Sequence, residues 1–584
     1  MKKSIKLSFI IISAIAILCL SLAYIPFFQN FAVSTVERLK NDDINDIFWK
    51  QQMFAFASLG ILFLLILNSI LFTKTGKKLF EDFINSIKNI FNTVKSNKKY
   101  LFILCGLYLF GYCSIIRANF WNIANDDLAR QLEGCRDWVN FYRYISEFGS
   151  IFLHTSKLIF DIAPLTQFIA LFFIALASFF TISIFSDNNF SIKLTIASLP
   201  IGLFPYFLSN YAYRYDSPYM AFSLCVCIIP FLFYKDFTNY IISSILCLFL
   251  MCISYQASSG IYIFMAVLVF LKMLLLEKKD SKTLFKFTLT SIICYAFTLL
   301  FFSFLFMEPN DGGTYVDESM NLSRFIPNTI TYISTLYNGL GKSSILIFSI
   351  LIIFSFIFAC TKVSLINKIT TFFVVSFASI FCVCLSFGSY LALARPEFIP
   401  RACVGIGVLI GSISVFTLSL LNNNKSIPSK LSLIIAFYLS YSCIAFSFGF
   451  GNAEYDQKEY IRFRASILAQ DLSECITEPD DEIELLFVNN IGYASTVEVI
   501  ADVYPVAKEM IDIGFIDDRK CQFILESFNL ISLKDKPNHY FKDANFPVVK
   551  DTAYHTIQNE DNKYLITFKN PHYKTIKTRR FIDE

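Results

Sequence analysis

Residues 122–130 read Asn-Ile-Ala-Asn-Asp-Asp-Leu-Ala-Arg, and this polar stretch separates two long runs of apolar residues. It contains two adjacent carboxylates, Asp126 and Asp127. Three arginines belong to the same polar interval: Arg130, Arg136 and Arg143. Most of the remaining chain is apolar enough to form membrane helices, so chemistry in contact with water can take place in this interval. We interpret it as the active-site loop of a membrane-embedded enzyme.

The composition places the chain among polytopic membrane proteins. Of its 584 residues, 55% are hydrophobic and 16% are charged, and phenylalanine alone occurs 67 times, which is atypical of a soluble domain. The net charge of +4 is small and scattered, so we expect no nucleic acid partner. The four histidines do not cluster and no Cys-x-x-Cys pair occurs, so we expect no zinc site.

Apolar runs divide the chain into about thirteen predicted membrane helices, because each crossing needs roughly 20 residues. The predicted spans are 7–28, 53–72, 100–116, 164–185, 194–211, 218–233, 239–254, 260–276, 287–307, 344–360, 370–391, 402–421 and 431–448. The loop after the second span is rich in lysine, and such loops stay in the cytoplasm. We therefore predict a cytoplasmic N-terminus, with the acidic stretch and the C-terminal part on the outer side.

The chain changes character at Asn452, where charged residues become more frequent and no further span follows. Residues 455–472 and 505–513 are predicted helices and 484–489 a predicted strand, which indicates a small α/β domain. We divide the chain into three parts: 1–98, two membrane helices and a basic loop; 99–451, the catalytic membrane core; and 452–584, a periplasmic domain. Cys475 and Cys521 lie in this last part and could pair there or remain free.

Polar residues gather at the outer ends of the predicted spans, whereas charge is almost absent from the middle of each span. Ion-coupled transporters usually keep an ionisable residue at membrane depth, so the pattern favours an enzyme that works at the outer interface. The candidate site residues are Asn125, Asp126, Asp127, Arg130, Arg143, Asp216, Gln256, Arg395 and Arg401. The tryptophans also lie near outer span ends, where they are expected to act as interfacial anchors: Trp49, Trp121 and Trp138.

This set of residues suits glycosyl transfer from a lipid phosphate. The leaving phosphate is already an anion, so it needs cations rather than a general acid, and the attacking hydroxyl needs a carboxylate base. Either Asp126 or Asp127 would be the base, while the other could orient the acceptor. Direct attack at the anomeric carbon predicts inversion. The chemistry requires no metal, although the aspartate pair could hold a divalent ion.

Six parts of the chain carry a resemblance to a known family. They are 125–130 (Asn-Asp-Asp-Leu-Ala-Arg), Trp138, 143–146 (Arg-Tyr-Ile-Ser), 161–167 (Asp-Ile-Ala-Pro-Leu-Thr-Gln), 215–217 (Tyr-Asp-Ser) and 254–258 (Ser-Tyr-Gln-Ala-Ser). Together they resemble the Gtr-type O-antigen glucosyltransferases of bacterial serotype conversion. The resemblance extends from about Tyr100 to the C-terminus and implies a GT-C-type fold with an acidic motif in the first large outer loop.

The resemblance also implies substrates and a location. The donor would be a hexose, commonly glucose, on undecaprenyl phosphate or another polyprenyl phosphate, with no further cofactor. The acceptor would be a lipid-linked O-antigen unit of lipopolysaccharide, on the periplasmic side of the bacterial inner membrane. The chain departs from the family at Tyr142, where we expect glycine before the arginine, here Arg143. The first two predicted spans are additional to the family core.

Simpler interpretations of the acidic loop remain open. Asp126 and Asp127 could form a solvated loop or cap a helix. Arg130 could pair with Asp126, four residues before it on a helix, and Arg143 with Glu147 has the same spacing.

The other outer residues also have simpler roles open to them. Asp216 could belong to an interfacial turn, and Gln256 could only satisfy backbone groups at a helix end. Arg395 and Arg401 could anchor the chain to lipid headgroups rather than hold a donor phosphate. His154 is expected to be a packing residue.

Two rival functions remain as alternatives. An O-antigen polymerase or ligase also uses large outer loops with arginines, but would not need a sugar on a lipid monophosphate. A flippase for lipid-linked sugars would need a cationic cavity at membrane depth, which the uncharged span interiors do not favour.

Overall fold

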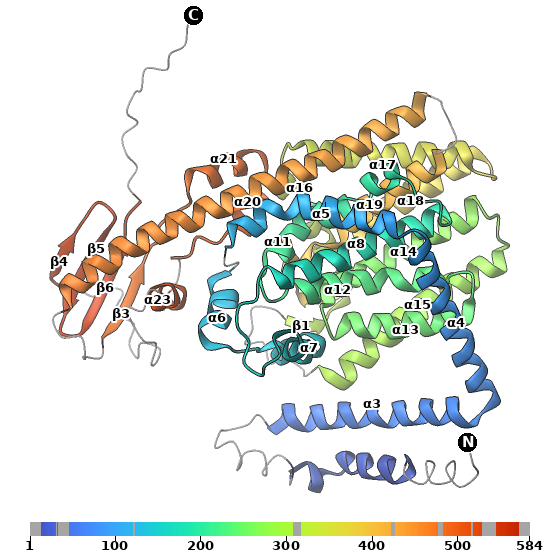
Figure 1. The fold of residues 1–584 in the computed structure, drawn as a ribbon, viewed down its shortest axis with the longest axis horizontal. Coiled ribbons are helices and arrows are strands. Elements are labelled where there is room, and N and C mark those ends of the chain that lie inside the picture. Colours follow the sequence, from blue (N-terminus) through green and yellow to red (C-terminus); the bar gives the residue numbers. More distant parts are fainter. Residues whose placement is uncertain are drawn as a thin grey trace, which may run out of the picture.

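The computed structural model describes residues 13–30, 32, 46–120, 123–307, 317–421, 427–476, 483–515, 518–527 and 545–570. The protein is mainly helical, as the sequence predicts, and its long helices form a bundle that runs from left to right in Figure 1. A small C-terminal sheet lies beyond the left-hand end of this bundle.

Eight helices in the described ranges are long and apolar enough to cross a membrane. They are α3 (Asp46–Phe72), α5 (Lys98–Ala118), α8 (Leu165–Ser186), α14 (Ser259–Leu275, with 256–258 before it), α15 (Ser281–Phe306), α17 (Ser344–Val363), α18 (Lys368–Leu385) and α20 (Ile427–Cys475). A ninth span results if a bent pair counts as one: α9 (Ile192–Ala197) and α10 (Pro200–Leu203), followed by α11 (Pro205–Ala212). The protein is therefore a multi-pass membrane protein by the length and composition of its helices.

Four further apolar helices in the described residues are shorter than a full crossing. They are 13–24, α12 (Ser217–Ile228) with η4 (Ile229–Phe233), α13 (Phe237–Cys252) and α19 (Gly405–Leu421). Each predicted span overlaps one of these helices or pairs, although residues 7–12 lie outside the described ones. The count of thirteen crossings is not confirmed, because helix length supports only eight or nine.

The bent pair places a site-forming loop at one end of the bundle. The two parts meet at an angle of 63°, and the break follows from Pro205, which has no N–H to continue the hydrogen bonds of α10. The second part, α11, ends at Ala212 and leads into residues 213–216.

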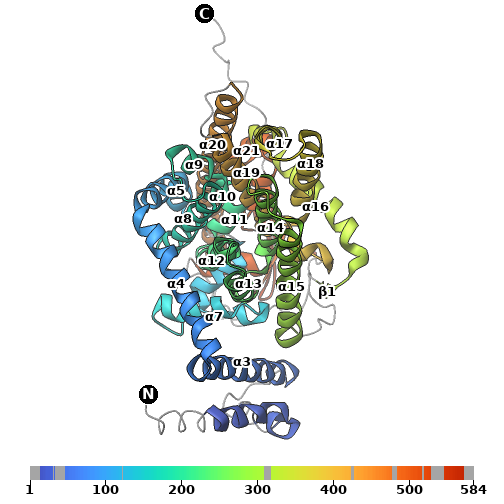
Figure 2. The same cartoon turned by 90° about the vertical axis from the view of Figure 1, so that its right-hand side faces the viewer.

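Short elements connect the long helices. On the side of the acidic loop they are η2 (Ile123–Leu128), α6 (Ala129–Glu133), η3 (Trp138–Phe141), α7 (Tyr144–His154) and η5 (Gln256–Ser258). A second group consists of β1 (Asp317–Met320), η6 (Leu322–Arg324), α16 (Phe325–Leu340), η7 (Gly388–Ala392), β2 (Leu393–Arg395) and η8 (Pro400–Ala402), with β1 and β2 antiparallel. Helix α4 (Lys74–Ser96) joins α3 to α5 and crosses the right-hand end of the bundle in Figure 1, the end that faces the viewer in Figure 2.

The C-terminal part is a small α/β unit, as predicted. Its sheet has the order β3-β6-β5-β4, with β3 and β6 parallel and the other neighbours antiparallel. The strands are β3 (Glu484–Val488), β4 (Val548–Asp551), β5 (His555–Glu560) and β6 (Lys563–Phe568), and the helices are α21 (Ser495–Val503), α22 (Val506–Met510) and α23 (Asp518–Glu526). Cys475 is a free thiol, so the possible disulfide with Cys521 is not formed.

Helix α20 links this unit to the bundle without interruption. Its first half packs along α5, and it continues through residue 452 to the sheet. The buried Arg464 near its far end donates hydrogen bonds to the backbone carbonyls of Tyr554 and Lys569, at 2.7 and 3.0 Å. The second half of α20 is therefore fixed to the open end of the β5–β6 hairpin, where β5 begins and β6 ends.

Candidate active site

The acidic loop lies at the end of the bundle nearest the C-terminal unit. Helix α5 ends at Ala118, and Asn119 follows in the left-handed conformation (φ 49°), which asparagine adopts more readily than most residues. The chain then enters η2, a single π-helical turn that carries both aspartates. Helix α23 packs against η2, so the C-terminal unit contacts the loop directly.

The two adjacent aspartates have different surroundings. Asp127 is fully buried (0% exposed), and its Oδ2 accepts a hydrogen bond from the backbone N–H of Arg214 at 3.1 Å. The side chain of Asp126 is 40% exposed, and its Oδ2 lies 3.5 Å from Nη1 of Arg401. Asp126 is therefore the carboxylate that a substrate can reach, whereas Asp127 belongs to the interior of the loop.

The interior position changes the acidity of Asp127. Burial raises the pKa of its carboxyl group to about 8, and the charge of Asp216 acts in the same direction. The hydrogen bond from Arg214 and the charges of Arg130 and Arg214 oppose this rise. At neutral pH the protonated form of Asp127 consequently predominates.

The stability of the protein should therefore depend on pH through Asp127. Its folded-state pKa of about 8 lies above the value of about 4 for an unfolded aspartate, so the folded state binds the extra proton between these values. The contribution of this group to the free energy of unfolding is complete below about pH 4. It falls as the pH rises towards about 8 and is lost above that. We expect the melting temperature of Asp127→Asn to fall less than that of the wild type between pH 5 and pH 8, when both are measured in the same detergent. Equal losses in the two proteins would contradict this prediction.

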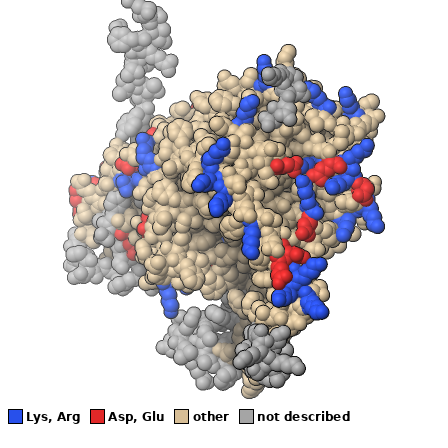
Figure 3. Space-filling model, turned by 45° about the vertical axis from the view of Figure 1, so that its right-hand side comes forward, with Lys and Arg blue, Asp and Glu red and all other residues tan. Residues whose placement is uncertain are grey.

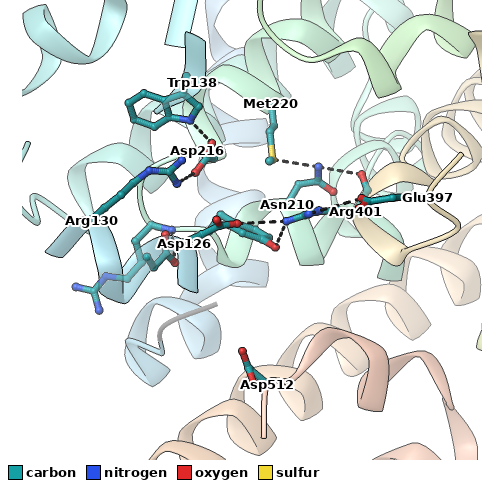
Figure 4. A network of polar contacts seen from close by, with 12 residues as sticks. Asp126, Arg130, Trp138, Asn210, Asp216, Met220, Glu397, Arg401 and Asp512 are labelled. Carbon is teal, nitrogen blue, oxygen red and sulfur yellow. Dashed lines mark hydrogen bonds and ion pairs between the residues drawn. The ribbon is translucent and has the colours of Figure 1, made fainter. Parts of the chain in front are cut away.

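Asp216 holds two parts of the site together. Its Oδ2 lies 2.6 Å from Nη1 of Arg130, and its Oδ1 accepts the indole N–H of Trp138 at 2.5 Å. The guanidinium of Arg130 also lies over the Trp138 ring, 4.5 Å from its centroid. Figure 4 shows Arg130 and Trp138 converging on Asp216. These buried contacts brace α6 and η3 against the segment that precedes α12.

Two of these side chains differ from simple expectations. The prediction that Trp138 is an interfacial anchor is wrong, because the residue is 0% exposed and packs edge-on against Tyr219. Arg130 on α6 pairs with Asp216 rather than with Asp126, which lies four residues earlier in η2. Both oxygens of Asp216 have protein partners, so its side chain acts as a structural bridge.

Arg214 connects the acidic loop to the neighbouring helices. Its backbone N–H holds Asp127, and its guanidinium pairs with Asp161 and donates to the carbonyl of Asn119 at 3.3 Å. Its own carbonyl accepts a hydrogen bond from the Thr166 hydroxyl at 2.5 Å. The sequence gives no signal for this role, because a backbone donor cannot be recognised from residue types.

Arg401 is the cation beside the exposed carboxylate. Its guanidinium lies between Asp126 and Glu397, with Nη2 3.7 Å from Oε2 of Glu397, and donates to the hydroxyl of Tyr213. Its backbone carbonyl accepts a hydrogen bond from Tyr255 at 2.9 Å. The side chain is 26% exposed, so part of the guanidinium remains accessible to a ligand.

Arg143 shares Tyr255 with Arg401. Its guanidinium lies 4.9 Å from the centroid of the Tyr255 ring and 5.2 Å from that of Phe141. Its Nε has no hydrogen-bond partner within the described part of the chain. The positive charges of Arg143 and Arg401 both act on the hydroxyl of Tyr255. Arg143 and Arg401 therefore meet at one buried tyrosine, and Arg401 also contacts Asp126.

The backbone before Arg143 explains why a glycine is expected there. Tyr142 has φ 57° and ψ 24°, in the left-handed region. A residue with a side chain loses roughly 1–2 kcal/mol in this conformation, whereas glycine adopts it freely.

Substitutions at Tyr142 should separate backbone strain from side-chain packing. We expect Tyr142→Gly to keep a melting temperature near that of the wild type, because relief of strain offsets the lost ring contacts. We expect Tyr142→Val to melt at a lower temperature, because branching at Cβ is poorly accommodated at positive φ. Thermal unfolding of both variants in one detergent tests this, and equal melting temperatures would show that strain at this position does not govern stability.

Gln256 and Arg395 are placed differently from the arginines around Tyr255. Gln256 donates its side-chain amide to the carbonyl of Phe141 at 3.2 Å, which joins η5 to η3. Arg395 is exposed on β2, and no contact among the described residues connects it to Asp126 or Asp127. The structure therefore joins Arg401 to the acidic loop directly and Arg143 to Arg401 through Tyr255, and it gives Arg395 neither link among the described residues.

The remaining outer residues have structural partners. Glu147 pairs with Arg136 at 3.1 Å rather than with Arg143. His154 is 1% exposed and stacks on Tyr215, so it is a packing residue, as expected. The side chain of Asn125 lies outside the described residues.

A buried carboxyl group that the sequence analysis missed lies near the acidic loop. Glu454 on α20 is 1% exposed, and neither of its oxygens has a hydrogen-bond partner among the described residues. One turn further on, Lys458 donates to the carbonyls of Ala118 and Asn119 at 2.7 and 3.1 Å. In the sequence, Glu454 is one of several charged residues after the last span, and no spacing distinguishes it.

The site therefore presents an accessible carboxylate beside guanidinium groups at one end of an apolar bundle. A carboxylate can accept a proton from a hydroxyl, and guanidinium groups form strong hydrogen bonds with phosphate oxygens. No three His, Cys, Asp or Glu side chains in the described ranges are arranged to hold a metal ion.

Comparisons with known proteins identify the family of this chain. A curated protein of Salmonella phage P22, described as an uncharacterized 55.3 kDa protein in the gtrB 5' region, is 28% identical over 229 residues. The match covers 37% of this chain and 46% of the phage protein, so the chain spans about half the length of this relative. No solved structure matches. The family model described as "Glucosyl transferase GtrII" matches residues 113–418, which is more than half of the chain and contains the acidic loop and Arg401. The chain therefore belongs to the GtrII family of glucosyl transferases.

Proposed function

We propose that this protein transfers glucose from a polyprenyl phosphate to a lipid-linked O-antigen unit on the periplasmic side of the bacterial inner membrane. The observation that carries the proposal is the accessible Asp126 carboxylate, 3.5 Å from the guanidinium of Arg401. The carboxylate can take the proton of the attacking hydroxyl, and the guanidinium beside it can stabilise the departing phosphate. Membership of a glucosyl transferase family supports the choice of sugar.

The proposed reaction is a single displacement at the anomeric carbon. The acceptor hydroxyl gives its proton to Asp126 while its oxygen forms the new bond to the anomeric carbon. The bond from that carbon to the phosphate oxygen breaks, and the electron pair leaves with polyprenyl phosphate. Arg401 and Arg143 balance the charge on the departing phosphate. Attack from the face opposite the leaving group inverts the configuration, and the protein's own side chains supply the base and the cations.

The neighbouring residues position these groups. Asp127, protonated at neutral pH, holds the backbone of Arg214, while the Arg130–Asp216 pair holds α6 against the loop before α12. We assign Gln256 to the alignment of η3, because it binds the Phe141 carbonyl two residues before Arg143. Arg395 and Asn125 are also proposed to contact the substrate.

The orientation in the membrane is part of the proposal. Seven lysines lie between Lys74 and Lys99, in α4 and the start of α5, and lysine-rich connections remain in the cytoplasm. This segment crosses the end of the bundle opposite the acidic loop (Figure 1). Asp126 then faces the periplasm, as does the unit after residue 452, whose α23 packs against η2. This contact makes the C-terminal unit a candidate for acceptor selection.

A cell-based experiment tests donor and product together. Lipopolysaccharide from cells with and without the protein is analysed by mass and glycosidic linkage, in strains with and without the synthase that makes polyprenyl phosphate glucose. We expect one added hexose per modified repeat, only when both the protein and the synthase are present. An added hexose without the synthase, or a change in chain length alone, would overturn the proposal and favour a polymerase or ligase.

A further inference from the structure

Helix α4 has two sharply different faces. Its apolar residues recur every three or four positions and so fall on one side of the helix: Phe80, Phe83, Ile84, Ile87, Ile90, Phe91 and Val94. Lys77, Lys88 and Lys95 are separated by 11 and 7 residues, close to whole numbers of turns, so they share one edge. This pattern is typical of a helix that lies along a surface rather than across a membrane.

The position of α4 agrees with this pattern. It begins directly after the apolar helix α3, where the Thr73 side chain accepts a hydrogen bond from the backbone N–H of Gly76 at 2.9 Å, and it ends directly before α5. It runs from top to bottom in both Figure 1 and Figure 2, across the direction of the bundle helices. It therefore occupies the level at which two neighbouring membrane helices end.

The protein covers only part of the apolar face. One side of α4 rests on the bundle, where Ser86 hydrogen bonds to Asn239 at 2.9 Å and Phe83 lies 6.0 Å from Phe233 between ring centroids. Phe80 and Phe91 remain 45% and 69% exposed. Large apolar side chains at this level need an apolar environment that the described residues do not provide.

The charged side of α4 favours an anionic partner. The helix carries five lysines against Glu81 and Asp82, a net charge of +3 from five minus two, and Lys98 and Lys99 follow at once. Its lysines have no ion pair with any carboxylate in the described part of the chain. On the face drawn in Figure 3, charged side chains gather towards the right-hand end, beside a broad uncharged surface.

A polar hollow next to α4 provides room for one headgroup. Its volume is about 240 Å³, and it lies where α4 meets the end of α8 and the start of α13. Hydroxyl, amide and ammonium groups make up most of its polar lining: Ser86, Asn89, Thr93, Ser183, Asn188 and Lys235. One carboxylate, Asp236, also lines it, and its oxygens already accept hydrogen bonds from Thr238 and Asn239. Such groups are donors for phosphate oxygens.

We infer that α4 is a membrane-surface helix that binds anionic phospholipid, at the end of the bundle opposite the active site. Its apolar face enters the boundary of the acyl chains, its lysine edge contacts lipid phosphates, and the hollow beside it takes one headgroup. The inference does not depend on the transferase activity, because α4 lies outside the segment that matches the glucosyl transferase family and its contacts on the bundle are away from the acidic loop.

The depth of the helix can be measured with two neighbouring tryptophan reporters in the full-length protein. In nanodiscs containing lipids brominated in the acyl chains, we expect Phe91→Trp to be strongly quenched and Asn92→Trp, on the polar side, to be weakly quenched. The signal of the wild type, with its own three tryptophans, is subtracted. Equal quenching of the two reporters would overturn the surface position.

Lipid selectivity is measured with the Phe91→Trp reporter. Two kinds of nanodisc carry the same fraction of brominated lipid, which is phosphatidylglycerol in phosphatidylcholine in one and phosphatidylcholine in phosphatidylglycerol in the other. The brominated phosphatidylglycerol should quench the reporter about threefold more, because each lysine attracts anionic lipid. Adding Lys77→Gln, Lys88→Gln and Lys95→Gln should remove this difference. The matched control, Lys157→Gln, Lys342→Gln and Lys563→Gln, should keep it. If the selectivity survives loss of the α4 lysines, the lysine edge does not bind the lipid headgroup. If inorganic phosphate abolishes the selectivity at constant ionic strength, the site binds free phosphate rather than a lipid headgroup.

Discussion

Asp126→Asn should lower the rate of glucosyl transfer by about 10²- to 10⁴-fold, the usual contribution of a general base. Asparagine keeps the shape of the side chain but cannot accept the proton from the acceptor hydroxyl. The exposure of Asp126 and its position beside Arg401 make it the base of the aspartate pair in our proposal. The measurement is the transfer rate of the purified protein in nanodiscs, with polyprenyl phosphate glucose as donor and lipid-linked O-antigen as acceptor.

Asp127→Asn is the matched control for this experiment. Asp127 is buried and has a pKa of about 8, so an amide resembles its protonated form at pH 7. We expect its rate to fall by less than about tenfold, a change of about 1.4 kcal/mol in the activation barrier. A large loss in Asp127→Asn with an active Asp126→Asn would move the base to Asp127. Full activity in both variants would remove the acidic loop from the mechanism.

Asp216→Ala should cause the largest loss of stability among single substitutions in the site. It leaves the buried guanidinium of Arg130 and the indole N–H of Trp138 without their shared acceptor. Removing one partner of a buried ion pair costs about 3–5 kcal/mol. Thermal unfolding in detergent should therefore show a melting temperature well below that of the wild type.

A second substitution tests whether the unpaired charge causes this loss. Adding Arg130→Met to Asp216→Ala removes the stranded cation, so the double variant should be more stable than Asp216→Ala alone. Asp551→Ala, which breaks an ion pair with Lys569 at an exposed position, should change stability little. If Asp216→Ala melts like Asp551→Ala, the Arg130–Trp138–Asp216 bridge does not hold the site together.

Composition and apolar runs were sufficient to predict a helical membrane protein with a small C-terminal α/β unit. Hydropathy marks a buried helix and a membrane-crossing helix in the same way. It therefore places α12, α13 and α19 correctly along the chain but cannot show that each is shorter than a full crossing. The same method treats α4 as a loop, because alternating lysine and apolar positions lower its mean hydropathy.

The candidate site was only partly predictable because burial decides the roles of its residues. Asp126 and Asp127 are equivalent in the sequence, yet one is accessible and the other has no exposed surface. Arg143 and Arg395 are both arginines near span ends, but only Arg143 shares Tyr255 with Arg401. The burial of Glu454 depends on the packing of α20 beside α5, a contact between segments more than 300 residues apart in the chain.

The uninterrupted course of α20 restricts how the protein can move. A helix of 49 residues is about 74 Å long at 1.5 Å per residue, more than twice the thickness of roughly 30 Å of a bilayer's hydrocarbon core. A rod of this length transmits tilt from one end to the other and leaves no hinge at residue 452. In the proposed reaction the acceptor therefore reaches Asp126 past a C-terminal unit that cannot swing away like a lid.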